Sequence, residues 1–350
     1  MKTRFFIMVA AVMLLFGCKD ANNNVVKIGV IGPLTGTGAT TSEYWVNGFN
    51  YAVEQLNANQ TDKKYELIIE DCQSDPAQTV ACYKRLEMQG VKYVVAVGGQ
   101  FAMAVAPLTK DKEVLFFTTA DYNEAILDQT NRGFRVFPSS AAFADSAANY
   151  MSRTYGYTNF ATFALNTAAC LDATTSFAKG VERVGGKMVF QETYDIGAYE
   201  FKSVVSRVAG KKAQGIFMTG FGISPVAFVN QIATNKAFDN VALFGDLNIA
   251  TRSFIENNKN AKATILYSDV RFPEEMENDY MGRFNGHSNS IATSSYIIPF
   301  LIQDAQANAT EKTIDGQLKY LRGNTINTAI GDIRIDERGS CDIPLQVYQL

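Results

Sequence analysis

The feature that most constrains this chain is an alternation of short apolar runs with amphipathic segments, which occurs twice in succession. The apolar runs have the length and composition of buried strands, and the segments between them carry apolar residues at helical spacing. Predicted strands of the first set cover 25–32, 65–71, 93–98, 114–119 and 133–137. Those of the second set cover 160–165, 187–194, 215–219 and 241–245. Strands joined by helical crossovers predict parallel sheets that helices cover on both faces.

The segments between the strands have recognisable helix starts and faces. A helix that begins near Thr41 or Ser42 carries Trp45, Phe49 and Leu56 on one face. An aspartate followed by proline starts the next helix, because such a pair caps the first turn. Further helices are predicted at 76–89, 103–110, 143–155, 174–184, 199–209 and 225–235. Because the alternation restarts after the fifth strand, we predict an α/β protein with two Rossmann-like lobes and a boundary near residue 137.

After Tyr267 the alternation weakens. Helices are predicted at 273–284, 291–307 and 314–321, and short strands at 330–335 and 344–348. A length of 350 residues exceeds one ordinary core and agrees with two domains. The formal net charge of −3, with no basic block, argues against nucleic acid as a partner, because lysine and arginine must neutralise its phosphates.

The N-terminus has the organisation of a targeting signal. A short basic start is followed by the apolar run 5–16, which at 12 residues is too short for a membrane span of ~20 residues. The next residues, 15–18, read Leu-Phe-Gly-Cys and resemble the lipobox of bacterial lipoproteins. We therefore expect residues 1–17 to be a signal peptide, Cys18 to be lipidated, and 18–24 to form a polar tether. An uncleaved membrane anchor is the alternative.

The four further cysteines and the one histidine are not spaced like the ligands of a metal site. Their spacing does not match a zinc site, and His287 lies in a polar stretch, so no metal and no cofactor are expected. Cys72 ends a predicted strand and Cys82 lies on the next helix, so a local disulfide and free buried thiols both stay open. Cys170 and Cys341 have no assigned partner.

Catalytic motifs are missing from the sequence. The loop from Gly32 to Gly38 lacks the lysine of a P-loop, and Thr41 stands where a dinucleotide fingerprint needs its third glycine. This loop is either a mild anion site at a helix start or a structural turn. There is no Gly-x-Ser-x-Gly elbow, and a Ser-His-Asp triad would depend on His287. These absences disfavour an enzyme.

Small, acidic and aromatic residues recur at the ends of five predicted strands. In open α/β sheets, ligands bind outside the carboxyl ends of the strands. These ends read 98–101 (GGQF), 118–122 (TTADY), 166–167 (NT), 220–222 (GFG) and 245–246 (GD). An aromatic wall with a few polar groups is typical of a cleft for a small molecule, which is what we expect here.

Several segments together resemble the type I periplasmic binding proteins of the branched-chain amino-acid-binding family. The opening strand, Gly/Thr loop and helix read KIGVIGPLTGTGATTSEYWVNGFNYAVEQLN. Further similarity lies in EDCQSDPAQTVACYKRL, in the third and fourth strands with the Ala-x-Ala-Pro helix between them, and in the closing IRIDERGSCDIPLQVYQ. The resemblance covers nearly all of residues 25–350. It implies two lobes whose parallel central sheets are joined by a three-strand hinge.

The resemblance also implies contacts for a ligand. In that family the carboxylate of the amino acid meets a serine and backbone N–H groups after the third strand, where this chain has Gly99, Gln100 and Phe101. Gly99 replaces the serine, so backbone donors and the Gln100 amide would remain. Ala120 matches a backbone carbonyl contact, and Tyr122 stands where a threonine is common.

The second lobe is expected to complete the site. Asp246 is the nearest match to the acid that takes the α-ammonium group in the family, and Phe221 falls where a tyrosine faces the ligand. The missing serine and the added aromatics leave an aromatic or other amino acid, an amide and a small carboxylate open as ligands. The remaining candidate ligand-binding residues are Asp121, Thr167, Tyr44 and Trp45.

The implied mechanism is closure of the hinge around the ligand. The chain would cross between lobes near Phe137, Ser268 and Thr328. The first lobe would then hold 25–137 and 268–328, and the second 138–267 and 329–350. A ligand that gains contacts only in the closed form shifts the population toward closure.

The resemblance further implies an ABC permease as partner and a place on the extracytoplasmic face of a bacterial membrane, held by the lipid on Cys18. A sensor that signals to a membrane partner and an exported enzyme are the alternatives.

Overall fold

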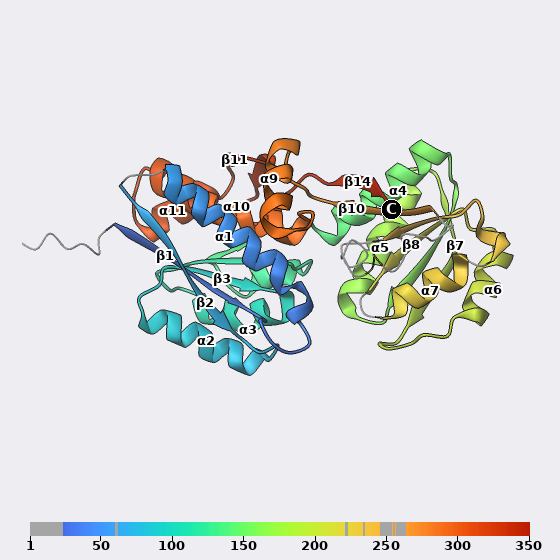
Figure 1. The fold of residues 1–350 in the computed structure, drawn as a ribbon, viewed down its shortest axis with the longest axis horizontal. Helices are drawn as coiled ribbons and strands as arrows, with labels where there is room; N and C mark the ends of the chain where they lie inside the picture. Colours follow the sequence, from blue (N-terminus) through green and yellow to red (C-terminus); the bar gives the residue numbers. More distant parts are fainter. Residues whose placement is uncertain are drawn as a thin grey trace, which may run out of the picture.

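The computed structural model describes residues 24–59, 62–220, 223–233, 235–245 and 264–350, together with residues 254 and 256. These residues form two α/β lobes that lie end to end along the long axis of the molecule (Figure 1). The first lobe combines the N-terminal strands with helices from the end of the chain, and the second is built from the middle of the chain. No described helix has the length and apolar character needed to cross a membrane.

The first lobe is built on a five-stranded parallel sheet with the order β2-β1-β3-β4-β5. Ile28 of β1 pairs with Leu67 on one side and Tyr93 on the other, so β1 is a central strand. Its long apolar run suits this position, because both faces of the sheet are covered. The strands are β1 (Val25–Gly32), β2 (Lys64–Asp71), β3 (Tyr93–Val97), β4 (Leu115–Thr119) and β5 (Gly133–Arg135).

Helices on both faces bury alternate side chains of this sheet. Val95 of β3 faces α1 (Ser42–Asn59) and α10 (Ser290–Asn308), whereas its neighbour Val94 faces α2 (Pro76–Met88) and α3 (Gly99–Thr109). This alternation follows from the two-residue period of a strand. The short 3₁₀ turns η1 (Ala39–Thr41) and η2 (Glu124–Asp128) lead into α1 and β5.

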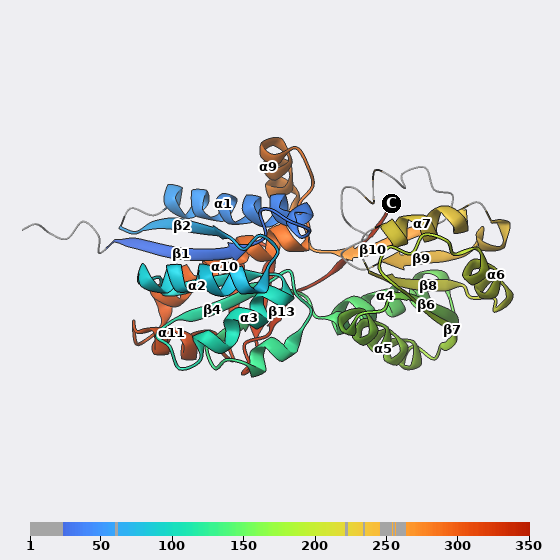
Figure 2. The same ribbon diagram turned by 90° about the horizontal axis from the view of Figure 1, so that it is seen from below.

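The last part of the chain returns to complete the first lobe. Here α9 (Glu274–Phe284), α10 and α11 (Ile314–Leu321) are followed by a small antiparallel sheet of β11 (Thr325–Thr328), β12 (Gly331–Ile335) and β13 (Cys341–Asp342). Figure 2 shows α10 beside α1 over the first sheet. The first lobe is therefore closed by segments that lie far apart in the sequence.

The second lobe contains a six-stranded sheet with the order β14-β10-β9-β8-β6-β7. All neighbouring strands are parallel except the edge pair β10 and β14. One face is covered by α4 (Ser140–Tyr155) and α5 (Ala168–Arg183), the other by α6 (Lys202–Gly210) and α7 (Ile223–Ala233). The strands are β6 (Asn159–Leu165), β7 (Lys187–Tyr194), β8 (Gly215–Thr219), β9 (Ala242–Gly245), β10 (Thr264–Asp269) and β14 (Gln346–Gln349), and the turn η3 (Lys236–Phe238) precedes β9.

Three segments connect the lobes. The first joins β5 to α4, the second follows β10, and the third joins β13 to β14. The predicted crossing near Thr328 is wrong, because Ile333 and Ile335 of β12 belong to the core of the first lobe. The predicted assignment of 329–350 to the second lobe therefore holds only for its last residues, around β14. The apolar pattern of β12 indicates a strand but does not say which lobe it joins.

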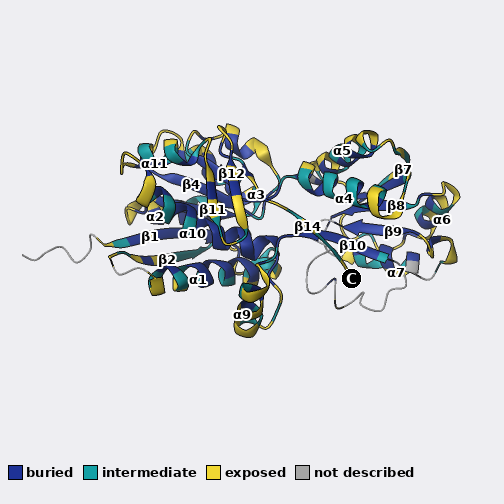
Figure 3. Cartoon of the chain, turned by 90° about the horizontal axis from the view of Figure 1, so that it is seen from above, coloured by how far each residue is buried: buried dark blue, intermediate teal, exposed yellow. Residues whose placement is uncertain are grey.

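Most predicted elements have the expected positions, and the fold class is confirmed. The bounds of β1, β7, β8 and α11 are the predicted ones, because glycines, prolines and capping residues mark their ends. The helices α3, α4, α5 and α7 begin earlier than predicted, and the difference is largest for α3, which begins at Gly99, and α5, which begins at Ala168. The strands β10, β11 and β13 were not among the predicted elements. Figure 3 shows that the central strands of both sheets are buried while the outer faces of the helices are exposed.

Candidate ligand-binding cavity

A cavity of about 500 Å³ lies between the two lobes, at the carboxyl ends of strands in both sheets. Its volume falls within the usual range for small-molecule sites. The wall from the first lobe consists of Gly98, Gly99, Gln100, Phe101, Ala120, Asp121 and Tyr122. The wall from the second lobe consists of Ser140, Phe143, Thr167, Cys170, Ala173, Phe217 and Thr219.

The N-terminus of α3 forms one part of the first wall. Gly98 is its N-cap residue, has a φ of 98° and provides no side-chain cap. The first N–H groups of a helix have no partner within the helix and carry a partial positive charge. A glycine at this position is required by the left-handed backbone. The N–H groups of Phe101 and Ala102 bond to the Gly98 carbonyl, so those of Gly99 and Gln100 are the donors that this helix start offers to the cavity.

A buried carboxyl group stands next to these donors. Asp121 follows β4 and is 6% exposed, and its Oδ1 accepts a hydrogen bond from the N–H of Asn123 at 2.8 Å. Its Oδ2 is buried and has no hydrogen-bond partner among the described residues. Burial raises the pKa of Asp121 to about 6, although the Asn123 N–H and the charge of Arg135 oppose this shift. Ala120, just before it, adopts a left-handed φ of 55°, which is uncommon for a residue with a side chain.

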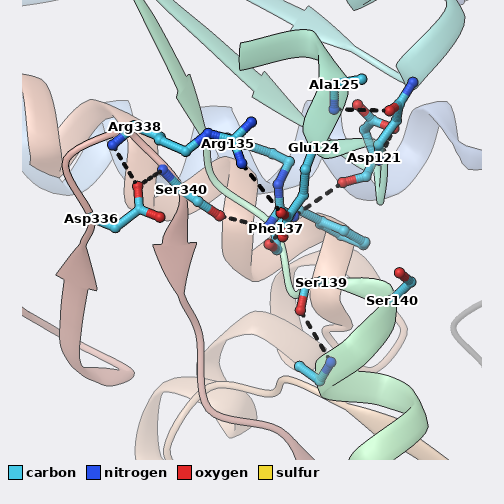
Figure 4. Close-up of polar contacts among 12 residues, drawn as sticks. Asp121, Glu124, Ala125, Arg135, Phe137, Ser139, Ser140, Asp336, Arg338 and Ser340 are labelled. Carbon is cyan, nitrogen blue, oxygen red and sulfur yellow. Dashed lines mark hydrogen bonds and ion pairs between the residues drawn. The ribbon is translucent and has the colours of Figure 1, made fainter. Parts of the chain in front are cut away.

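Arg135 of β5 ties the cavity wall to the first connecting segment and to the turn between β12 and β13. Its guanidinium is 1% exposed and donates to the Phe137 carbonyl at 2.6 Å and to Ser340 Oγ at 2.7 Å. It also lies 3.4 Å from the backbone carbonyl of Asp121 and 3.3 Å from Glu124 Oε1. Figure 4 shows Arg135 near Phe137 of the first connection and Ser340 of the turn before β13, with Asp121 beyond it. The arginine therefore fixes the backbone, not the carboxylate, of Asp121.

The second wall is made of hydroxyl groups and apolar side chains. Ser140 Oγ donates to Asp172 Oδ2 at 2.8 Å at the start of α4. Thr167 is the N-cap of α5 and accepts a hydrogen bond from the Cys170 N–H at 3.4 Å. Phe143 and Phe217 add aromatic surface. Among the described lining residues there is no lysine, arginine or histidine, so the only full charge on either wall is that of Asp121.

Seven of the predicted ligand-binding residues line this cavity. They are Gly99, Gln100, Phe101, Ala120, Asp121, Tyr122 and Thr167. Tyr44 and Trp45 are not among the described lining residues and belong to the core of the first lobe, so their contact with a ligand stays a prediction. Trp45 packs against Gly32, where an added Cβ would stand 2.9 Å from the indole ring. The helical spacing that places Trp45 on the apolar face of α1 accounts for this burial.

Some predictions fall outside the described residues. These are the proposed contacts Phe221 and Asp246 and the lipidation site Cys18. Sequence reasoning also missed part of the second wall, namely Ser140, Phe143, Cys170, Ala173, Phe217 and Thr219. Ser140 and Cys170 lie in the first turns of α4 and α5. A search that covered the first turn of the helix after each strand, as well as the strand end, would have included them.

The structure also bears on the predicted disulfide, on metal binding and on the glycine loop after β1. Cys72, Cys82 and Cys341 are free, buried thiols, so the local disulfide is not formed, and Cys170 is also buried. The described residues contain no group of histidine, cysteine and acidic side chains that could hold a metal ion. In the glycine loop after β1, the N–H of Leu34 and the hydroxyl of Thr35 bind Asp71 at 2.9 and 2.7 Å. The structural reading of this loop is therefore the better one, because its donors already hold a carboxylate of the chain.

The fold and the two-walled cavity are those of proteins that bind a solute between two lobes. The profile of the family described as "Periplasmic binding protein" matches residues 25–350. The chain belongs to this family of solute-binding proteins, as a type I member of its branched-chain amino acid group.

Relatives of known description cover nearly the whole chain. The leucine-, isoleucine-, valine-, threonine-, and alanine-binding protein of Pseudomonas aeruginosa is 22% identical over 90% of this chain and 87% of its own length. A solute-binding protein of Rhodopseudomonas palustris, solved with 3,4-dihydroxybenzoic acid, matches with a TM-score of 0.78 at 19% identity, covering 93% and 92% of the two chains. A branched-chain amino acid binding protein of Streptococcus pneumoniae, solved with isoleucine, also has a TM-score of 0.78, at 17% identity and coverages of 93% and 95%. At these identities the structural matches establish the fold alone.

Proposed function

We propose that this chain is an extracytoplasmic solute-binding lipoprotein of an ABC importer, and that it holds a small amino-acid-like ligand and releases it unchanged. The observation that carries this proposal is the cavity whose walls come from both lobes. A ligand in such a cavity contacts both walls only when they are close together. Its binding free energy therefore favours the closed form over the open one.

The composition of the walls supports a ligand with an apolar body and a polar head. Phe101, Tyr122, Phe143 and Phe217 provide aromatic surface, and the N-terminus of α3 provides donors for a carboxylate. The relatives named above bind branched-chain and small amino acids or aromatic acids. A similar ligand range is expected here. The lining contains no pairing of a nucleophile with a histidine base, which agrees with binding without chemistry.

The ligand can be found by a thermal-shift screen of the purified chain against amino acids, amides and small carboxylates. A true ligand present at 100 times its dissociation constant adds roughly 2.7 kcal/mol to the free energy of unfolding. Mass spectrometry of the released ligand should recover it unchanged and in a one-to-one ratio. A product of altered mass would instead favour the exported enzyme, and no stabilisation by any member of the three classes would contradict the proposal.

The lipid anchor needs a separate test. We expect the native chain to fractionate with membranes and its mature N-terminus to be a diacylated Cys18. Replacing Cys18 by serine should release the chain from membranes while ligand binding by the folded lobes stays unchanged. Equal membrane association of both forms would contradict lipidation and favour an uncleaved anchor. Uptake of the identified ligand in cells that lack this chain distinguishes the importer from a sensor, because only the importer role predicts its loss.

A further inference from the structure

Asp121 is the one ionisable carboxyl among the described lining residues. One of its two oxygen atoms has no hydrogen-bond partner among the described residues. Its Oδ1 accepts from the Asn123 N–H at 2.8 Å, whereas its Oδ2 is buried without any hydrogen bond. A buried acceptor without a donor is unfavourable, and a buried carboxylate without compensation is more so. The described protein groups do not provide the missing donor, so a ligand in the cavity is the natural source.

Gly99 shows that the position of this carboxyl is built into the wall. A Cβ added at Gly99 would stand 2.4 Å from Asp121 Oδ1 and 2.9 Å from its Cγ. Any side chain at position 99 would therefore displace the carboxyl from the start of α3. The loop after β3 and the loop after β4 are thus matched, a glycine in one making room for an acid in the other.

The charge balance of the cavity decides what kind of donor fits. No basic side chain is among the described lining residues, and Arg135 lies 3.4 Å from the backbone carbonyl of Asp121. A ligand carrying only a carboxylate would bring a second negative charge next to Asp121. A ligand with an ammonium group brings its own compensation. The aromatic walls also favour a cation, because the face of an aromatic ring attracts positive charge.

We propose that Asp121 is a specificity-determining residue whose free Oδ2 accepts a hydrogen bond from a cationic nitrogen of the ligand. The ligand class is therefore an amine or a zwitterionic amino acid with an apolar body, rather than a simple aromatic or aliphatic acid. This inference rests on the proposed solute-binding function and narrows it. An ammonium group has three N–H donors, so it can meet further acceptors on the facing wall as well.

Matched ligand pairs test this assignment. The probes are L-phenylalanine with 3-phenylpropanoate, and L-leucine with 4-methylpentanoate, with phenethylamine and isoamylamine as the corresponding amines. Calorimetry is carried out on the full mature chain and on Asp121→Asn, which keeps the shape and removes the charge. Glu182→Gln is the control, because it removes an equal charge at an exposed position of α5 that does not line the cavity.

We expect the wild type to bind ammonium-bearing members and to discriminate against the matched simple acids. In Asp121→Asn the affinity for the ammonium-bearing members should fall by roughly 100-fold or more, as for other buried charge pairs that lose one partner. The affinity for the simple acids should stay equal or rise. Glu182→Gln should leave all affinities unchanged. If Asp121→Asn weakens both members of a pair equally, or neither, the assignment is overturned while solute binding stands.

A measurement on the wild type alone covers the case in which the variant does not fold. Affinity for the bound amine or amino acid should decline as the pH falls through about 6, where Asp121 takes up a proton, and affinity for the matched acid should not. The charged group that acts on Asp121 is Arg135, whose own partner is Glu124, and the other titratable side chains among the described lining residues are Tyr122 and Cys170. A parallel pH profile for both members of a pair would overturn the assignment. If the six probes and the wider thermal-shift screen yield only ligands without a cationic nitrogen, this inference fails and the proposed function stands; the proposed function fails when the screen yields no ligand at all.

Discussion

The two lobes share one layered architecture but are closed in different ways. The sheet of the second lobe is formed from one continuous part of the chain, with only β14 added from the end. The first lobe needs α10 and the β11–β13 sheet, which return from more than 200 residues further along the chain than α1. This difference places the connections between lobes at the first lobe, where Arg135 binds Phe137 of the first connection and Ser340 of the turn that precedes β13.

The two walls of the cavity also differ in their polar groups. Among the described lining residues, the first lobe contributes the one charged group and a helix N-terminus, whereas the second contributes hydroxyls and apolar surface. A charge on one wall and a largely neutral surface on the other suit a mechanism in which the ligand is oriented on the first lobe before the second closes over it. The first lobe thus carries both the specificity and the hinge attachments.

The largest effect is expected from breaking the attachment of the connections to the first lobe. Arg135→Met keeps much of the volume but leaves the Phe137 carbonyl and Ser340 Oγ without their donor. Because the guanidinium and Phe137 are buried and Ser340 is partly buried, we expect the free energy of unfolding to fall by roughly 3 kcal/mol in urea denaturation. Arg338→Met is the control, since its ion pair with Asp128 is half-exposed and should contribute below about 1 kcal/mol. Equal losses in both variants would remove the special role of Arg135.

The second prediction compares the main helix pair of each lobe. A Cβ at Gly48 of α1 would stand 2.2 Å from the backbone oxygen of Ala292 on α10, which cannot move aside as a side chain can. Gly48→Ala should therefore cost roughly 2 kcal/mol of unfolding free energy. In the second lobe, Gly180 of α5 faces Asp145 Oδ1 at 3.1 Å and Ala148 at 3.2 Å.

Gly180→Ala is expected to change the unfolding free energy by less than about 0.5 kcal/mol, because the gain in helix propensity offsets the tighter contact. Hydrogen exchange can assign each loss to a lobe, and Gly48→Ala should weaken protection in the first lobe only. A larger loss for Gly180→Ala than for Gly48→Ala would show that the second lobe has the tighter helix packing.

The sequence predicts the positions of single strands better than it predicts helix starts or the lobe to which a strand belongs. Local signals place the strands well, since β7 follows a pair of glycines and β8 is a short apolar run after a polar turn. The start of α3 is missed because Gly98 and Gly99 read as a loop, whereas the left-handed Gly98 begins the helix without a capping side chain. The lobe to which β12 belongs depends on distant packing, and its own residues carry no signal for it.

The candidate site is predictable to a similar extent. Strand-end logic finds the residues after β3 and β4, because parallel strands bring their carboxyl ends to one edge. It does not reveal that Asp121 Oδ2 lacks a partner, that Gly99 makes room for the carboxyl, or that Arg135 meets Ser340 from 205 positions away. These facts depend on side-chain geometry between segments that the sequence does not place relative to each other.

The smallest predicted effect concerns two buried acids, one at the cavity and one at the end of the second sheet. Burial raises the pKa of Asp121 and of Asp269 from 3.8 to about 6. Asp269 differs in having donors to its Oδ1, the Ser290 N–H at 2.6 Å and the Val270 N–H at 2.9 Å. Both groups hold more protons in the folded than in the unfolded chain between these pKa values.

Stability should therefore rise as the pH falls from about 7 toward 4, and each carboxyl should contribute on the order of 1 kcal/mol to this rise. Asp121→Asn removes the contribution of the first lobe and leaves that of Asp269, so the slope of unfolding free energy against pH should decrease by about half. Urea titrations at a series of pH values measure both slopes. An unchanged slope in Asp121→Asn would mean that Asp121 is ionised in the empty cavity, and that its orphaned oxygen is hydrated until a ligand replaces the water.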